Sequence, residues 1–449
     1  MTKEGPARQG AALAVERPIV AFVAVDWADR QHVWAARAAD SEVVERGTVD
    51  NTPEAIQAWA RELTRFGGLL AVALEQSRGA LLFTLSQYEH LVLYPVHPGT
   101  LANFRQALCP SGAKDDPRDT DLLLTLLVQH RDRLRVWQPD TVETRTLYLL
   151  VEKRRRLVDD KTRESNRLTA VLKEYFPQAV SWLEDVDSEM AGAFLQRWPT
   201  LEQVQQATPE SVREFFYQHN CRSAQLIRER LEQIRTAQPA TRDQAVICSG
   251  VIDVGVLVQL LATLRQGIDE LNGQIARLFN HHPDAALFRS LPGAGPVLAP
   301  RLLVALGTRR QRFAKASELQ SYSGIAPVTK RSGRTELVLA RHACPKFLRQ
   351  TFHEWAGHSI RFCNWAAQYY QHQRQNKNQS HQAAVRALAF KWQRILFRCW
   401  QDGVPYDNAR YEHTLATRKA PKPPKPDYRK PRWKDLGGFF QFVGFAMPS

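Results

Sequence analysis

Eight apolar residues in the middle of the chain recur in alternating steps of three and four. They are Val254, Leu257, Leu261, Leu264, Ile268, Leu271, Ile275 and Leu278. This spacing is typical of an apolar stripe on a long helix, which must be buried against a second helix. The segment at about 143–175 carries apolar residues at compatible spacing, so the two can pair as an antiparallel arm with residues 178–250 inserted between them. The same stripe can instead join two copies of the chain as a coiled coil, and the spacing fits both arrangements.

The N-terminal part of the chain has the pattern of an α/β domain. Apolar runs rich in strand-forming residues predict strands at 19–25, 31–36, 69–74 and 91–96. Thr52 followed by Pro53 predicts a helix to about residue 65, with threonine as the N-cap and proline at the first helical position. A further helix is expected near 79–90 and another from Asp119 onward.

Acidic residues stand where two of these strands end and where the last helix begins. Asp26 ends the first apolar run, Glu75 ends the run at 69–74, and Asp116 and Asp119 are three residues apart at the helix start, where they share one face. Hard carboxylate oxygens suit Mg²⁺, and two such ions can activate an attacking oxygen and stabilise a leaving one. Taken singly, each acid is more often a solvated loop residue. Together, in this order, they predict the metal site of an RNase H-like nuclease fold.

The C-terminal third, about 286–405, is predicted to be mainly helical. Helices are expected at 298–306, 315–322, 345–373 and 381–400. Gly293 and Gly295 lie in a turn similar to the hairpin of helix-hairpin-helix modules, in which glycines let backbone N–H groups approach a phosphate. A tight turn between two helices is the alternative. The tryptophans of the last helix are expected in the core, although stacking on bases is possible.

The composition favours a polyanionic partner. The 449 residues carry a formal net charge of +15, although a basic surface can also serve solubility alone. The six cysteines form no CxxC pair, which indicates neither a disulfide framework nor a zinc ribbon. No uninterrupted apolar stretch of about 20 residues is evident, so no membrane span is expected. Residues 1–17 are predicted to be a disordered leader, 406–449 a basic proline-rich tail, and the protein to act at the nucleoid in a bacterial cytoplasm.

Two groups of motifs resemble the IS110-type (DEDD) transposases, over roughly residues 19–130 and 286–400. The family's Lys-[Ser/Thr]-Asp-x-x-Asp-Ala motif corresponds to Lys114-Asp115-Asp116-Pro117-Arg118-Asp119-Thr120. Asp115 and Thr120 depart from the pattern, and the register on Lys114 favours Asp116 and Asp119 as ligands. The second group is Pro292-Gly293-Ala294-Gly295, then Gly324-Ile325-Ala326-Pro327 with Ser332-Gly333. Cys344-Pro345-Lys346-Phe347 stands where the family often has Gly-Asn, which blurs the subgroup.

The resemblance implies an RuvC-like N-terminal domain and a C-terminal transposase domain that carries a serine nucleophile. Ser332 would form a covalent link to DNA, while Asp26, Glu75, Asp116 and Asp119 would hold one or two Mg²⁺ ions. From spacing alone, Ser332 could also be an ordinary residue of a DNA-contacting turn. The residues expected to contact nucleic acid are Lys114, Arg154, Arg155, Arg156, Gly293, Gly295, Lys330, Arg331 and Arg334. Partners implied are donor and target DNA, a structured bridge RNA, and further copies of the chain in a dimer or tetramer.

The sequence thus predicts a DNA transposase or site-specific recombinase of an insertion sequence. The expected fold is α/β plus α: an RuvC-like domain over 18–142, a helical and coiled-coil region over 143–285, and a transposase domain over 286–405. An RuvC-like Holliday-junction nuclease would need the four acids without the serine. A non-catalytic nucleic-acid-binding protein would need neither.

Overall fold

The computed structural model describes residues 18–75, 79–108, 116–333 and 335–417. The predicted leader at 1–17, Lys114, Asp115, Arg334 and residues 418–449 of the predicted tail lie outside the described residues, whereas Asn408–Thr417 of that tail form a helix. The chain divides into two compact units, Met1–Pro139 and Asp140–Ser449, and each is treated by itself below.

The first unit is built on a mixed five-stranded sheet in the order β3-β2-β1-β4-β5. Its strands are β1 (Ile19–Asp26), β2 (Gln31–Ala38), β3 (Glu45–Asp50), β4 (Leu69–Leu74) and β5 (Leu91–Pro95). The hairpin β1–β2 and the pair β2–β3 are antiparallel, whereas β1–β4 and β4–β5 are parallel. This sheet is compatible with the RNase H-like domain expected from the sequence. The edge strand β3 was not predicted, because only Val49 among its six residues is buried.

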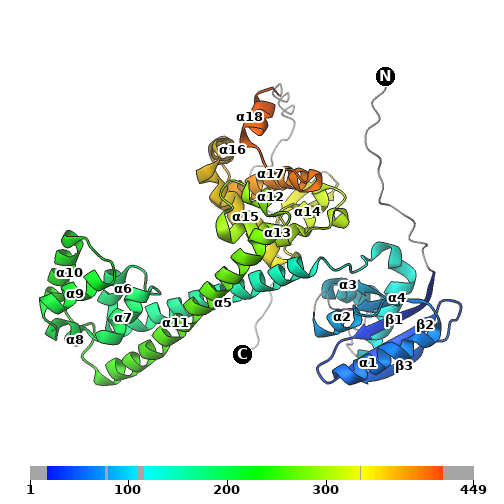
Figure 1. Cartoon of the computed structure of the whole chain (residues 1–449), viewed down its shortest axis with the longest axis horizontal. Helices are drawn as coiled ribbons and strands as arrows, with labels where there is room; N and C mark the ends of the chain where they lie inside the picture. The colour runs from blue at the N-terminus through cyan, green and yellow to red at the C-terminus, as the bar shows by residue number, and fades with distance from the viewer. Residues whose placement is uncertain (1–17, 76–78, 109–115, 334, 418–449) are drawn as a thin grey trace. The chain divides into compact units, whose positions relative to one another are not determined.

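Helices cover both faces of this sheet (Figure 1). On one face, α1 (Pro53–Glu62) and α2 (Ala80–Leu85) pack on the larger side chains of β1 and β4, such as Val25 and Val72. The predicted N-cap of α1 is confirmed, since Thr52 Oγ1 accepts a hydrogen bond from the backbone N–H of Ala55 at 3.2 Å. On the other face, α3 (Pro98–Leu108) and α4 (Asp116–His130) pack on four strand alanines: Ala24, Ala35, Ala71 and Ala73. These small side chains let α4 lie close to the sheet. Short 3₁₀ turns occur at Leu63–Phe66 and Arg131–Arg133.

Two long helices form the arm of the second unit, α5 (Val142–Tyr175) and α11 (Gln244–His281) (Figure 1). They are antiparallel, as three hydrogen bonds along their length show: Thr144–His282 at 3.0 Å, Arg154–Asn272 at 2.5 Å and Arg167–Asp253 at 2.7 Å. Five of the eight predicted stripe residues are buried, namely Val254, Leu257, Leu261, Ile268 and Ile275. The intramolecular arrangement is therefore the one that the chain adopts, while a coiled-coil supercoil stays a prediction.

Five short helices form the insertion at one end of the arm. They are α6 (Pro177–Leu183), α7 (Glu189–Arg197), α8 (Leu201–Gln206), α9 (Pro209–Gln218) and α10 (Ala224–Thr236). Their core joins the end of α5 and the beginning of α11, with Phe194 and Phe216 fully buried.

The helices after α11 pack at the other end of the arm. They are α12 (Ala285–Arg289), α13 (Gly295–Leu306), α14 (Ala316–Tyr322), α15 (Lys346–Phe362), α16 (Asn364–Gln375), α17 (His381–Asp402) and α18 (Asn408–Thr417), with a 3₁₀ turn at Arg310–Arg312. Their core contains Trp355, Trp392 and Trp400, all fully buried, as expected for the tryptophans of the last helix. The prediction of a single helix at 345–373 is wrong. Two helices replace it, because Cys363 has an extended backbone (φ −142°) and is buried between them.

Helix α11 bears on the expectation that no segment spans a membrane, but it does not overturn it. This helix is long and apolar enough, by length and composition, to cross a membrane. Asp253 and several uncharged polar residues and glycines interrupt its sequence, so it contains no long unbroken apolar run. A core helix passes the same test, and one face of α11 packs against α5. The residues Ile252, Val256 and Leu260 are exposed on the same helix.

Candidate functional site

Asp26 and Glu75 lie side by side at one edge of the sheet. Asp26 is the last residue of β1, and Glu75 follows the last residue of β4. The two strands are parallel, and Val25 is in register with Leu74. The residues that follow them, Asp26 and Glu75, are therefore also neighbours, because adjacent strands lie about 5 Å apart. Side chains alternate between faces, and Ala24 and Ala73 belong to the core under α4. The same alternation directs both carboxylates to the α4 face.

Helix α4 brings Asp119 to this face of the sheet. The helix packs against β1, β2 and β4, with its leucines in the shared core. Asp119 is only 1% exposed, so its carboxylate is nearly removed from water. It is held by Arg105 of α3, whose Nε donates to Oδ1 at 2.7 Å and whose Nη2 lies 2.6 Å from Oδ2. The side chain of Asp116, at the start of α4, is outside the described part of the chain.

The crowded acids of α4 point in different directions. Asp121 pairs with Arg46 of β3, through Nε–Oδ1 at 3.1 Å and Nη2–Oδ2 at 3.3 Å. Residues two apart on a helix are separated by roughly 200° around its axis. Asp121 therefore faces the β3 edge, while Asp119 faces α3.

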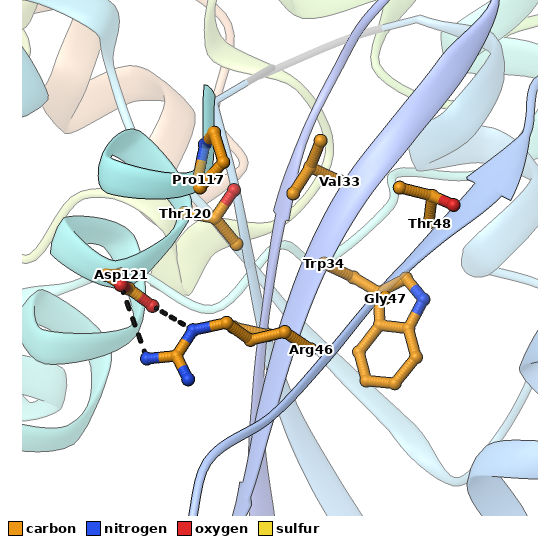
Figure 2. Close-up of a pocket in the computed structure, with 9 residues that line it drawn as sticks. Val33, Trp34, Arg46, Gly47, Thr48, Pro117, Thr120 and Asp121 are labelled. Atoms are coloured by element: carbon orange, nitrogen blue, oxygen red, sulfur yellow. Dashed lines mark hydrogen bonds and ion pairs between the residues drawn. The ribbon is translucent and has the colours of Figure 1, made fainter. Parts of the chain in front are cut away.

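A shallow hollow of about 250 Å³ lies between α4 and the β2–β3 pair. Figure 2 shows Thr120 and Pro117 on one side of it, with the Arg46–Asp121 ion pair below. The ring of Trp34 points away from α4 and packs on Trp59, with 6.1 Å between ring centroids. Val33 lines the hollow and is the register partner of Asp26. The hollow thus adjoins the acidic edge and offers a mainly apolar surface beside it.

The donor chemistry of this edge fits a hard divalent cation, but the ligands are not assembled around one point. In the described ranges, no three His, Cys, Asp or Glu side chains are grouped closely enough to hold a metal ion. Asp26 and Glu75 supply two carboxylates, and Arg105 holds the third. Two arginines of this region, Arg105 and Arg46, were missed from the sequence. The single signal for Arg105 is a basic residue on the helix that precedes the acidic motif.

Ser332 lies at the tip of a hairpin in the second unit. It ends β6 (Val328–Ser332), which pairs antiparallel with β7 (Thr335–Leu339), and its register partner is Thr335. Gly333 has φ +55°, a conformation that suits glycine in the two-residue connection. A loop was expected here from the sequence, but the structure has a ribbon, all of whose described residues except Val328 are exposed.

The basic residues near Ser332 are on the same ribbon. Lys330 and Arg331 are exposed, and Arg331 Nε lies 3.1 Å from Glu336 Oε2 on the facing strand. Lys330 shares the face of Ser332, because side chains two residues apart on a strand point the same way. Arg331 points to the opposite face. Of this pair, the lysine is thus the cation on the serine's face.

The two glycines of the proposed phosphate turn have different surroundings. At Gly293 (φ +71°) an added Cβ would lie 2.9 Å from the backbone carbon of His358, so this glycine permits close packing of the turn on α15. Trp355 Nε1 strengthens that contact by donating to the Pro292 carbonyl at 3.0 Å. Gly295 (φ +56°) is exposed and has open space around its Cα. Its backbone is the accessible part of the turn.

The three consecutive arginines of α5 are also not equivalent. Arg154 is half-buried and donates from Nε to Asn272 at 2.5 Å, and burial lowers its pKa against the opposing charge of Asp269. Arg155 pairs with Asp159 on its own helix at 3.1 Å. Arg156 is exposed, so it has the most accessible side chain of the three.

Comparison with known proteins agrees with the motifs in both units. Residues 23–177 match a family model described as a transposase, of the DEDD type of IS110, and residues 285–371 match a model described as the transposase IS116/IS110/IS902 family. A protein assigned as the mini-circle transposase for IS117 of Streptomyces coelicolor is 26% identical over 410 residues, covering 88% of this chain and 97% of its own length.

Two further relatives belong to insertion elements. The 43.6 kDa protein of insertion element IS110 from Streptomyces coelicolor is 25% identical, over 82% of this chain and 91% of its own. The 42 kDa protein of IS900 from Mycobacterium paratuberculosis is 26% identical, over 78% and 84%. The family matches and the relatives define the class of protein as a DNA transposase, an enzyme that acts on DNA strands. The chain belongs to the IS110 family of insertion-sequence transposases.

Proposed function

We propose that this transposase cuts and rejoins DNA with the acidic residues Asp26, Glu75, Asp116 and Asp119 and the nucleophile Ser332. The observation that carries the proposal is the register of β1 and β4, which sets Asp26 and Glu75 next to each other on the face covered by α4. The family is one whose DEDD domain generally implies use of a divalent metal. Mg²⁺ bound there would supply charge stabilisation for the phosphoryl oxygens and lower the pKa of an attacking hydroxyl.

The covalent step proposed for Ser332 breaks one phosphorus–oxygen bond for each one that it forms. Its Oγ forms a bond to a DNA phosphorus, the bond from that phosphorus to one deoxyribose oxygen breaks, and the serine proton passes to the leaving oxygen. A hydroxyl from another strand end then attacks the phosphoserine and restores the serine. Lys330 supports this role, since it lies on the serine's face of the hairpin and its ammonium group can hold a phosphate oxygen.

A covalent adduct tests the serine directly. Full-length protein incubated with a DNA duplex that carries the element's ends should yield a protein–DNA adduct that survives denaturation, and Ser332→Ala should yield none. Thr335→Val is the matched control, because Thr335 is the exposed hydroxyl opposite Ser332 in the hairpin, and it should keep the adduct. A Ser332→Ala protein that recombines at the wild-type rate would instead favour an RuvC-like junction nuclease.

The acidic residues need a separate test. Asp26→Asn and Glu75→Gln should each abolish strand cleavage while leaving DNA binding close to wild type. A protein that keeps its biological effect with both changes would be a nucleic-acid-binding protein without catalysis.

We also propose that a structured RNA and further copies of the chain take part. The net charge of +15 supports a large polyanionic partner, and the family resemblance supports a bridge RNA that pairs with donor and target DNA in a bacterial cytoplasm. Holding two duplexes at once favours a dimer or tetramer. RNA that co-purifies with the protein and maps beside its gene would support the first point, and mass measurement of the complex tests the second.

A further inference from the structure

The ion pair between Arg105 and Asp119 is the feature of the acidic edge that the proposed function does not explain. One guanidinium lies against both oxygens of the carboxylate: Nε donates to Oδ1 at 2.7 Å, and Nη2 lies 2.6 Å from Oδ2, a buried oxygen that accepts no hydrogen bond in the described part of the chain. The Arg105 side chain is 18% exposed and that of Asp119 is 1% exposed. The pair is therefore largely shielded from water, where a charge-assisted hydrogen bond between an arginine and a carboxylate is strong.

Burial explains why Asp119 needs a cation at this position. A carboxylate removed from water without a partner is strongly unfavourable. Before any ion binds, Arg105 supplies that partner from α3, the helix that precedes the acidic motif. It fixes the carboxylate in one orientation.

The same contact opposes a divalent cation. An ion bound to Asp119 needs either Oδ1, which accepts from Arg105, or Oδ2, which has Nη2 only 2.6 Å away, and it would bring two more positive charges beside the guanidinium. We propose that Arg105 competes with the divalent metal for Asp119, so that the metal joins the site only as the guanidinium leaves the carboxylate. Arg105 is then a positioning residue that sets the metal affinity of the site. This inference rests on the proposed role of Asp119 as a ligand.

The structure provides a matched control in a second arginine that pairs with an acid of α4. Arg46 also pairs with an acid of α4, donating to both oxygens of Asp121 two residues further along the helix, but this pair faces β3 and is more exposed. Arg46→Gln and Arg105→Gln remove the same charge from the same unit. The competition predicts a change in metal affinity for Arg105→Gln alone.

The test is Mn²⁺ binding to the full-length protein without nucleic acid, measured by electron paramagnetic resonance of the free ion. Arg105→Gln should bind Mn²⁺ about five- to tenfold more tightly than wild type, as expected when a strong competing pair is removed. Arg105→Lys keeps the positive charge but loses the planar guanidinium, so its Mn²⁺ affinity should lie between those of wild type and Arg105→Gln. This variant also tests the inference if Arg105→Gln does not fold. Arg46→Gln should match wild type. Without metal, Arg105→Gln should melt at a lower temperature, and added Mn²⁺ should raise its Tm by more than that of wild type.

Glu75→Gln separates the two ways in which the inference can fail. If wild type binds Mn²⁺ in a manner that Glu75→Gln weakens, yet the two Arg105 variants bind it with unchanged or lower affinity, the competition is refuted and the metal site stands. If no variant binds Mn²⁺ in a manner that depends on Glu75, both the competition and the metal site are refuted. Tighter binding by Arg105→Gln that Glu75→Gln weakens supports both.

Discussion

His282 Nε2 lies 3.0 Å from Thr144 Oγ1, and this buried contact closes the arm where α11 ends beside the first turn of α5. The backbone N–H of Asp284 donates to Nδ1 of the same ring at 3.1 Å. A backbone N–H can only donate, so Nδ1 is an acceptor and the ring is neutral with its proton on Nε2. Burial lowers the pKa of His282, against the charges of Asp284, Asp140 and Glu143 and together with that of Arg310.

This environment predicts loss of stability in acid. A histidine whose pKa is lower when folded binds more protons when unfolded, so its contribution is complete above the unfolded pKa of about 6.5 and is lost as the pH falls below it. Thermal unfolding between pH 7.5 and 5.5 should show a falling Tm. His282→Asn should reduce that fall, although His32 and His353, whose pKa values burial also lowers, will keep part of it. An identical pH dependence in the variant would refute the assignment.

Glu75→Gln should stabilise the metal-free protein while it abolishes cleavage. Asp26 and Glu75 are neighbours across two strands, and like charges in that position repel. Removing one charge should raise the free energy of unfolding by up to about 1 kcal/mol in EDTA. Urea denaturation measures it. Asp50→Asn, which changes the acid that ends β3, two strands away from Asp26 in the sheet, serves as the control and should show no such gain.

Substitution of Gly293 and of Gly295 should distinguish a glycine needed for packing from one whose backbone is accessible to a ligand. Gly293→Ala should destabilise the protein by about 2 kcal/mol or more, because it adds an unfavourable φ to a contact with the α15 backbone. Gly295→Ala has the unfavourable φ alone and should lose about 1 kcal/mol. If the turn binds phosphate, Gly295→Ala should also weaken DNA binding at a temperature where it remains folded. Equal destabilisation of the two variants would contradict the packing account.

Substitutions of two arginines of α5 should likewise separate an effect on nucleic-acid binding from an effect on stability. Arg156→Gln should lower nucleic-acid affinity and reduce the slope of log K against log salt concentration by about one, the effect of a lost phosphate contact. Arg154→Gln should mainly lower stability, by about 1 kcal/mol, since it removes a half-buried hydrogen bond to Asn272. Fluorescence anisotropy with a labelled duplex at several salt concentrations, paired with melting curves, gives both quantities.

The parts of the fold that depend on apolar pattern were predictable from the sequence. Buried apolar runs, such as the one that ends in Asp26, correctly predicted strands. The stripe of apolar residues in steps of three and four correctly predicted α11. The polar edge strand β3 and the hairpin of Ser332 were not predicted, because exposed strands carry little apolar pattern. The break at Cys363 was missed because a buried cysteine carries no breaking signal of its own.

The acidic site was predictable only in part, for a related reason. Strand ends fix where Asp26 and Glu75 lie, since adjacent parallel strands bring their carboxyl ends together. The direction of a helical acid depends on its partner, and the partners of Asp119 and Asp121 are arginines 14 and 75 residues away in the sequence. No local pattern identifies such pairs.

The paired helices also set a fixed distance within the second unit. The 34 residues of α5 span about 50 Å at 1.5 Å per residue, with the insertion packed at one end and the C-terminal helices at the other. At 3.4 Å per base pair, that length equals about 15 base pairs, or nearly one and a half turns of duplex. A rod of this length holds the insertion and the C-terminal helices a fixed distance apart.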